Sequence, residues 1–266
     1  IGGSPLIAIT TAQAAALAER LGGGALVRAA MRFSAPTIGD ALSELTREAI
    51  TNVVGIVMSP QYSELLMGGY RRAIGEAIAT LGAEAPDVRL AGSWHLEPHF
   101  ISALAERIRH GLSLLRSNGA ARVPVLLTAH SLPRRVAEQE PEYIEQLHET
   151  AATVAAAADL DADRWKFCWQ SAGHEPGEWM KPDFADLMPE LAAAGHAAVL
   201  VAPIQFLADH LEILYDIDVG ARDQAHAAGL TFRRIESLNT DAQFIDALAA
   251  VAERTSRSFT RRLPVA

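Results

Sequence analysis

Cysteine is almost absent from this sequence, and its scarcity excludes several kinds of site. Cys168 is the single cysteine among 266 residues, so no disulfide can form within them. Zinc centres and iron–sulfur clusters that require several thiolates are excluded for the same reason. We therefore expect no iron–sulfur cluster, and we expect a protein of a reducing compartment, the cytoplasm.

Long hydrophobic runs and an excess of positive charge are also missing. No apolar run approaches the roughly 20 residues that a membrane-spanning helix needs, so we expect no integral membrane segment. The formal net charge is −9 at pH 7, whereas a general nucleic-acid-binding protein presents a basic surface. We expect no nucleic-acid partner. A few arginines can still bind an anionic small molecule locally.

Short apolar segments alternate with longer segments of helical period along the whole chain. Strands are predicted within residues 24–36, 52–63, 87–94, 123–130, 164–173, 196–206 and 231–238. The first of them ends near Arg32 and Phe33, and the second ends at Ser59 and Pro60. Segments with apolar residues at helical spacing lie between most of them. This alternation predicts an α/β fold with parallel sheets covered by helices.

The scheme runs twice, which indicates two Rossmann-like halves. The second run begins after a predicted long helix at 98–119, and we place the boundary in or near that helix. No Pro-, Ser- or Gly-rich linker separates the halves, so they should pack closely and share a cleft. In open parallel sheets, ligands bind beyond the carboxyl ends of the strands.

His130 ends the buried-strand pattern VLLTAH at 125–130 and precedes Ser131 and Pro133. Its position suits a base or a metal ligand that projects into the cleft. The alternative is a histidine that bonds a nearby carbonyl while Ser131 caps the following helix. The sequence leaves both interpretations open.

The segment FLADHLEILYDID at 206–218 carries several carboxylates. On a helix, Asp209, Glu212 and Asp216 would share one face, and neighbouring carboxylates suit binding of a cation or of protons. Asp209 and Glu212 also have capping-box spacing, which would explain these two without any ligand. Asp216 and Asp218 are not explained by capping.

Four segments, in order along the chain, resemble those of ferrochelatases, the family that inserts ferrous iron into a porphyrin. TAHSLP at 128–133 is similar to the family's S-A-H-S-L/I-P motif. FLADHLEILYDID is similar to F-x-x-D-H-x-E-x-L-Y-D, and WQSAGHEPGEWMKPD at 169–183 to Q-S-x-G-x-x-P-x-P-W-L-x-P-D. GGSPL at 2–6 matches the family's G-G-S-P-L turn.

The resemblance implies two Rossmann-like domains with the porphyrin held between them. The first would comprise residues 1–97 together with a returning C-terminal segment, 241–266, and the second residues 98–240. The family has a further strand before this point. Because the sequence opens at Ile1 inside what reads as a loop, we expect an N-terminal segment, including that strand, to be missing.

The resemblance also implies roles for single residues. His130 and Glu212 would be catalytic, facing the ring centre from opposite sides, one taking pyrrole protons and the other meeting the metal. His130, Glu212 and Asp216 would be the residues that meet the metal. His210, Asp209 and Ser131 would orient these residues. Gly220 stands where relatives have a further acidic residue, and Asp218 is a candidate to replace it. Candidate porphyrin contacts are Ser4, Arg32, Ser63, Gln170 and Trp179.

The resemblance implies Fe²⁺ and a porphyrin as substrates and no permanently bound cofactor. The segment at 169–183 is most similar to the monomeric bacterial branch, so we expect a monomer and favour coproporphyrin III over protoporphyrin IX. Two other functions remain open: a chelatase for cobalt or nickel acting on another tetrapyrrole, and a non-catalytic porphyrin or haem carrier. A carrier would need neither the histidine nor the acidic face.

Overall fold

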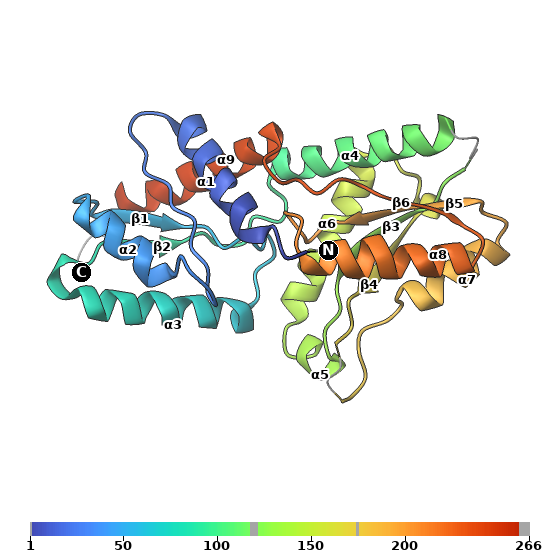
Figure 1. Cartoon of the computed structure of the whole chain (residues 1–266), viewed down its shortest axis with the longest axis horizontal. Helices are drawn as coiled ribbons and strands as arrows, with labels where there is room; N and C mark the ends of the chain where they lie inside the picture. Colours follow the sequence, from blue (N-terminus) through green and yellow to red (C-terminus); the bar gives the residue numbers. More distant parts are fainter. Residues whose placement is uncertain (1, 118–121, 174–175, 261–266) are drawn as a thin grey trace.

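The computed structural model describes residues 2–117, 122–173 and 176–260. The end of the predicted C-terminal segment, 261–266, lies outside these residues. Within them the chain forms two parallel sheets with helices around both (Figure 1). The fold is α/β, as the alternating pattern predicts.

The first sheet is small. It pairs β1 (Asn52–Gly55) with β2 (Asp87–Leu90) in parallel. Three helices of this half are α1 (Leu6–Leu21), α2 (Ile38–Arg47) and α3 (Glu64–Leu81). Two of them begin at side-chain caps that satisfy free backbone N–H groups: Thr37 and Asp40 form a capping box on α2, and the Ser63 hydroxyl accepts from Leu66 N on α3.

The second sheet has four parallel strands in the order β4-β3-β5-β6. They are β3 (Val125–His130), β4 (Trp165–Gln170), β5 (Ala198–Pro203) and β6 (Thr231–Arg234). β3 and β5 are central and almost wholly buried, because helices cover both faces of such a sheet. In this register His130 pairs with Gln170, at the carboxyl ends of β3 and β4.

The helices of the second half divide between the two faces of the sheet. α4 (Pro98–Ser117) and α6 (Pro141–Ala157) pack on one face, and α7 (Phe184–Ala193) lies on the other. The π-helical segment η3 (Ile213–Ala221) packs beside α7 and continues into α8 (Arg222–Ala227). A short helix, α5 (Arg134–Ala137), follows β3.

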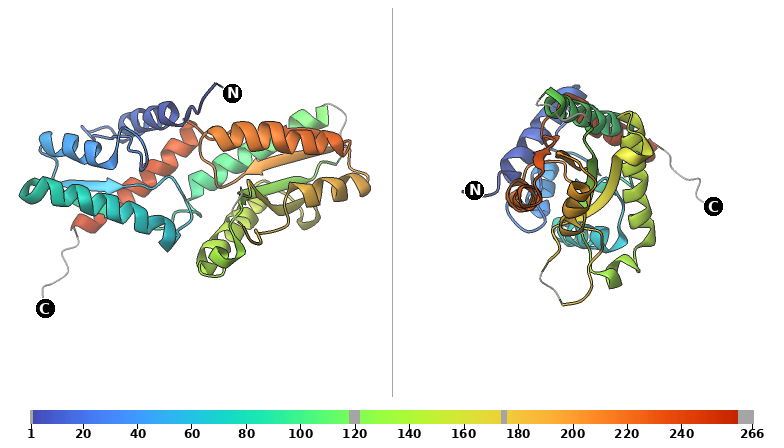
Figure 2. Two further views of the ribbon diagram at one scale, coloured as in Figure 1. Left: turned by 60° about the horizontal axis from the view of Figure 1, so that its bottom comes forward. Right: turned by 90° about the vertical axis from the view of Figure 1, so that its right-hand side faces the viewer.

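Helix α9 (Ala242–Thr260) follows β6 in sequence but packs against α1, β1 and β2. Figures 1 and 2 show it crossing from the second half to the first, beside α1. The chain thus returns to the half in which it began.

Polar contacts join the two halves along a seam between α6 and the loops after β1 and β2. Gln146 Oε1 accepts from Tyr62 N at 2.8 Å and from the Ser93 hydroxyl at 2.7 Å. His95 Nε2 lies 2.8 Å from Glu149 Oε2. These polar contacts add to an apolar core that the two halves share, in which Trp94 packs against Phe100 and Phe244.

Two predicted elements differ from the structure. Residues 24–36 form no strand and have only an isolated bridge between Met31 and Thr37. The predicted helix after Phe206 is not a regular α-helix, because residues 213–221 adopt π-helical hydrogen bonding. Helix α2, for which we made no prediction, follows the segment that lacks the strand.

Candidate active site

His130 stands at the carboxyl end of β3, and its hydrogen bonds fix both its backbone and its ring. The backbone N–H donates to Gln205 Oε1 at 2.7 Å. Ring atom Nδ1 lies 2.5 Å from the carbonyl oxygen of Ser131. A carbonyl oxygen can only accept, so Nδ1 carries the proton and Nε2 of the neutral ring presents its lone pair. This nitrogen suits either a base or a metal ligand.

Glu212 meets His130 directly. Its Oε2 lies 3.4 Å from His130 Nε2, and the two side chains are 47% and 32% exposed. A flat ring between two groups would hold them about 7 Å apart, twice an ordinary van der Waals contact. The expectation that they face the macrocycle from opposite sides is therefore wrong for this conformation. Both would approach a ring from the same side.

His210 supports this pair with the opposite arrangement of its ring nitrogens. The Glu212 backbone N–H donates to His210 Nδ1 at 3.3 Å, so here Nδ1 is the acceptor. Burial lowers the pKa of His210, against the opposing charges of Glu212 and Asp209, so its neutral form is favoured. Its ring packs edge-on against Phe206, which also contacts the edge of the His130 ring.

Asp209 is not a helix cap. Its carboxylate accepts from Ser237 Oγ at 2.7 Å and Asn239 Nδ2 at 2.9 Å, and it lies 3.4 Å from Arg234. These partners come from the segment at and after the end of β6. The capping alternative for Asp209 and Glu212 is therefore wrong. Asp209 instead attaches the start of the helix to the segment at and after the end of β6.

The other two carboxylates of this segment differ in their partners. Asp216, on η3, is half-buried, and we find no hydrogen bond or ion pair for it within the described ranges. Asp218 is held by Arg234 through two contacts of 2.7 and 2.9 Å. Asp218 is therefore occupied in an ion pair and is not free to replace the acidic residue missing at Gly220.

Ser131 follows β3, Gln170 ends β4, and Trp179 forms an isolated bridge with Pro133. Ser131 is buried; its N–H donates to Gln170 O at 2.7 Å and its hydroxyl to Met180 O at 3.2 Å. Gln170 is also buried, and its Oε1 accepts from Thr128 Oγ1 at 2.5 Å, while its Nε2 has no partner among the described atoms. Trp179 is half-buried, and its ring packs on Gly173.

The remaining candidates for porphyrin contact are not gathered around His130 by any described contact. The Ser4 hydroxyl is exposed and accepts from Leu6 N at 3.4 Å. The exposed Arg32 stacks on Phe33 and Tyr70, and Ser63 is buried as the cap of α3. This capping bond alone is a structural reason for a serine at position 63, without any ligand.

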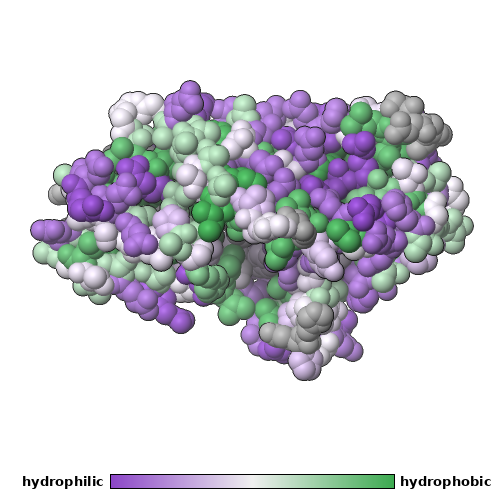
Figure 3. All heavy atoms as spheres, viewed as in Figure 1, coloured by the Kyte–Doolittle hydropathy of each residue, from purple (hydrophilic) through white to green (hydrophobic). Residues whose placement is uncertain are grey.

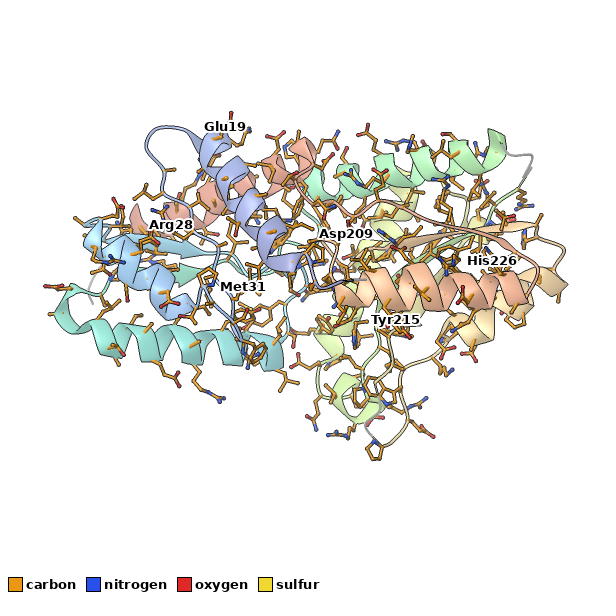
Figure 4. The ribbon with its side chains drawn as sticks, viewed as in Figure 1. Glu19, Arg28, Met31, Asp209, Tyr215 and His226 are labelled. Carbon is orange, nitrogen blue, oxygen red and sulfur yellow. The ribbon has the colours of Figure 1, made fainter. Side chains whose placement is uncertain are left out.

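Figure 3 shows the surface hollowed between the two halves, with hydrophobic residues around the hollow. In Figure 4, Asp209 lies at the start of the orange helix that carries Glu212, and Tyr215 on its lower side. Tyr215 is 58% exposed despite its size.

A cavity of about 410 Å³ lies apart from His130, between α5, α6 and Lys181.

The described residues contain no cluster of three or more His, Cys, Asp or Glu placed to hold a metal ion. His130, Glu212 and Asp216 therefore do not form a closed site.

The sequence prediction missed Gln205 and Tyr143. Gln205 Oε1 holds the His130 backbone, while its Nε2 is hydrogen-bonded to the Tyr143 hydroxyl. Burial raises the pKa of Tyr143 to about 12. The position of Gln205, directly after β5 and beside the end of β3, is the signal that could have found it.

A family profile described as Ferrochelatase matches residues 1–256. The chain belongs to the ferrochelatase family. It is 40% identical over 258 residues to a ferrochelatase of Deinococcus radiodurans, a match that covers 96% of this chain and 81% of that protein. It is 33% identical over 261 residues to the coproporphyrin III ferrochelatase of Bacillus subtilis, covering 94% and 82%. Membership makes this ferrochelatase homologue a metal-inserting enzyme of the lyase class.

Solved structures agree on the fold. SirB from Bacillus subtilis with Fe³⁺ matches with a TM-score of 0.65 at 11% identity, covering 94% of this chain and 92% of that one. CbiX, described as the terminal enzyme of sirohaem biosynthesis in denitrifying bacteria, matches with a TM-score of 0.61 at 19% identity and the same coverage. Among the described residues, no helix is long and apolar enough to cross a bilayer.

Proposed function

We propose that this chain inserts Fe²⁺ into a porphyrin during haem synthesis, with coproporphyrin III as the favoured ring. The observation that supports it best is the 3.4 Å approach of His130 Nε2 to Glu212 Oε2 at the carboxyl end of β3. The naming of several relatives as coproporphyrin III ferrochelatases supports the choice of ring.

The reaction needs both a metal ligand and a proton acceptor. A porphyrin loses two N–H protons when a divalent ion replaces them, so a base must stand beside the ring. Neutral imidazole binds iron well, and a carboxylate accepts protons or binds the cation. His130 and Glu212 share these two tasks from one side of the ring. Asp216, four residues after Glu212, continues a path of carboxylates that conducts metal in or protons out.

The chain's other residues set the geometry in this proposal. The Ser131 carbonyl holds the His130 ring so that Nε2 faces the reacting centre. Gln205 fixes the His130 backbone, and Trp179 flanks the ring site beside it. Fe²⁺ is a substrate here, and we propose no resident cofactor. We also propose that the chain acts as a monomer in the cytoplasm.

An anaerobic insertion assay tests the function and the ring together. Purified chain is mixed with Fe²⁺ and either coproporphyrin III or protoporphyrin IX, and absorbance reports the metalloporphyrin. We expect a larger kcat/KM with coproporphyrin III. Equal or faster turnover of protoporphyrin IX would contradict the choice of ring.

The same assay separates the two alternative functions. Insertion of Co²⁺ or Ni²⁺ without insertion of Fe²⁺ would indicate another tetrapyrrole chelatase. Tight binding of both metal-free and metallated rings, with no conversion of either porphyrin, would indicate a carrier. Either result would overturn the proposal.

A further inference from the structure

Arg234, the last residue of β6, has several acceptors around its guanidinium group. Nε and Nη2 donate to the two carboxylate oxygens of Asp218, at 2.7 and 2.9 Å. Nη2 also lies 3.4 Å from Asp209 Oδ1. Nη1 donates to Ile235 O at 2.9 Å and to Ser237 Oγ at 3.1 Å. The guanidinium thus makes four hydrogen bonds, and its contact with Asp209 is an ion pair.

The two carboxylates that Arg234 binds lie on either side of the candidate catalytic segment. Asp209 stands three residues before Glu212, and Asp218 two residues after Asp216. One side chain on β6 therefore holds the helix before and after both acidic residues of the site. The Arg234 side chain is only 13% exposed, so solvent weakens these contacts less than it would on an open surface.

Asp209 is bound firmly on the same side. Burial alone would raise its pKa, but hydrogen bonds from Asn239 and Ser237 and the charge of Arg234 outweigh burial, and the pKa is lowered. In addition, Asn239 Oδ1 accepts from the Asp209 backbone N–H at 2.9 Å. The start of the helix is thus fixed by both its backbone and its side chain.

Glu212 itself has little to hold it. Within the described ranges its carboxylate makes no hydrogen bond, and its close polar neighbour is His130 Nε2 at 3.4 Å, so the backbone decides where the carboxylate lies. That backbone runs into π-helical geometry, which is rarer and less regular than an α-helix. A clamp from outside the helix is therefore needed to keep Glu212 and Asp216 in place.

We propose that Arg234 is a positioning residue for metal insertion. By binding Asp209 and Asp218, Arg234 fixes the positions of Glu212 and Asp216. This role rests on the proposed function. It has a second effect: with Arg234 absent, Asp209 and Asp218 would be uncompensated carboxylates beside the site. They would repel their neighbours and compete for the incoming cation.

Lysine cannot replace Arg234 fully. An ammonium group is a point charge with three donors, whereas the planar guanidinium grips Asp218 through two parallel bonds while also reaching Asp209. Arg234→Lys keeps the positive charge but loses the two parallel bonds to Asp218. Its behaviour therefore separates neutralisation of the carboxylates from positioning.

The test compares Arg234→Met and Arg234→Lys with Arg233→Met. Arg233 is the preceding residue of β6; its side chain projects to the other face of the strand, and it has no hydrogen bond or ion pair among the described residues. We measure kcat, KM for Fe²⁺ and the dissociation constant of coproporphyrin III. Amide hydrogen exchange of residues 209–221 reports the clamp in the absence of substrates.

For Arg234→Met we expect kcat/KM for Fe²⁺ to fall by about tenfold or more, as for loss of a residue that orients a metal ligand. Exchange in 209–221 should be faster and porphyrin affinity unchanged. Arg234→Lys should fall between this variant and the parent, and Arg233→Met should match the parent. Faster exchange with parental kcat and KM would leave Arg234 a purely structural role and overturn the inference.

Failure of the inference can be told from failure of the proposed function. If the parent and Arg233→Met insert no metal, the function itself is wrong and the inference falls with it. If both insert Fe²⁺ and a folded Arg234→Met does so equally well, only the inference is wrong. If Arg234→Met fails to fold, Asp218→Asn is measured instead, because it removes the charge of one carboxylate that Arg234 binds and leaves Arg234 itself in place. Parental kinetics of Asp218→Asn would then overturn the clamp.

Discussion

The character of each histidine in the site depends on which of its ring nitrogens has a partner. His130 bonds a carbonyl through Nδ1 and presents a lone pair at Nε2. His210 accepts through Nδ1 and so presents an N–H at Nε2 when it is neutral. Two residues of the same type, both in contact with Glu212, therefore offer opposite chemistry. We infer that His130 reacts and His210 orients.

The sequence could locate these histidines but could not assign their protons. Their positions follow from a strand-end pattern and a helix pattern, both of which are local. Their proton positions follow from Ser131 O and from the Glu212 backbone, which depend on the folded loop. For the same reason the sequence could not show that His130 Nε2 and Glu212 Oε2 lie 3.4 Å apart.

At the same scale, His148 predicts a pH dependence of stability. Its ring lies on α6, 4.4 Å from the centre of the Phe167 ring, and burial lowers its pKa from 6.5. The unfolded chain therefore binds the proton more readily, so this contribution to stability is complete above about pH 6.5 and is lost as the pH falls towards the folded-state pKa.

Urea unfolding at about pH 7.5 and about pH 5.5 measures this loss. We expect the free energy of unfolding to fall less between these values in His148→Gln than in the parent. The same substitution at His226, exposed on α8, controls for the removal of a histidine. An equal loss in parent and His148→Gln would contradict the assignment.

At the scale of elements, the sequence predicted the strands of both sheets and most of the helices, but it also predicted a strand at 24–36 that does not form and missed the π-helical shape of residues 213–221. The apolar period after Phe206 is compatible with α or π geometry, because both bury Ile213 and Ile217. A contact distant in sequence holds the π-helical segment, namely that between Asp218 and Arg234. Periodicity carries no information about such a contact.

The failed strand at 24–36 has a similar cause. A strand needs a neighbour, and within the described residues this segment makes only the bridge between Met31 and Thr37. Arg28 in its middle is instead paired with Glu44 on α2, at 2.6 Å. The apolar pattern predicted a strand, but a local pattern carries no information about whether a partner strand lies beside it.

Close packing of α4 on β5 gives a prediction for this scale. A Cβ added at Gly111 would come within 2.8 Å of Leu200 Cδ1 in the core, whereas one at Gly75 on α3 meets nothing within 4 Å. Gly→Ala in a free helix position is stabilising by roughly 0.5–1 kcal/mol. In a tight core position the extra methyl costs about 1–3 kcal/mol.

We therefore expect Gly75→Ala to raise the free energy of unfolding and Gly111→Ala to lower it. Denaturant unfolding of both variants beside the parent measures the difference. A stabilising Gly111→Ala would mean that α4 and β5 are packed less closely than the structure indicates.

At the scale of the whole molecule, polar contacts along α6 join the two halves beside the apolar core that they share. Glu140 accepts from the backbone of Glu64 and Leu65 at the start of α3, at 3.1 and 2.7 Å. Gln61 Nε2 donates to Thr150 Oγ1 at 2.9 Å. In the sequence these residues are ordinary helix and loop positions, so the seam could not be predicted. The absence of a linker predicted only that the halves pack closely.

Gln146 tests whether this seam stabilises the molecule. Its Oε1 accepts from Tyr62 N and Ser93 Oγ, so Gln146→Ala leaves two donors without their acceptor. We expect a loss of about 1–3 kcal/mol in the free energy of unfolding, read by denaturant unfolding. The neighbouring Glu145→Ala, exposed on α6, should change stability by much less. Equal effects of the two variants would show that the seam contributes nothing.

The role of Glu212 in metal insertion is tested most directly by a single-turnover measurement. Coproporphyrin III is bound to the parent, to Glu212→Gln and to Asp223→Asn, an exposed carboxylate on α8, and Fe²⁺ is added without oxygen. We predict that all three bind the ring alike, that Asp223→Asn inserts iron at the parental rate, and that Glu212→Gln is slower by about 100-fold or more. Insertion by Glu212→Gln at the parental rate would contradict the assignment of the active site.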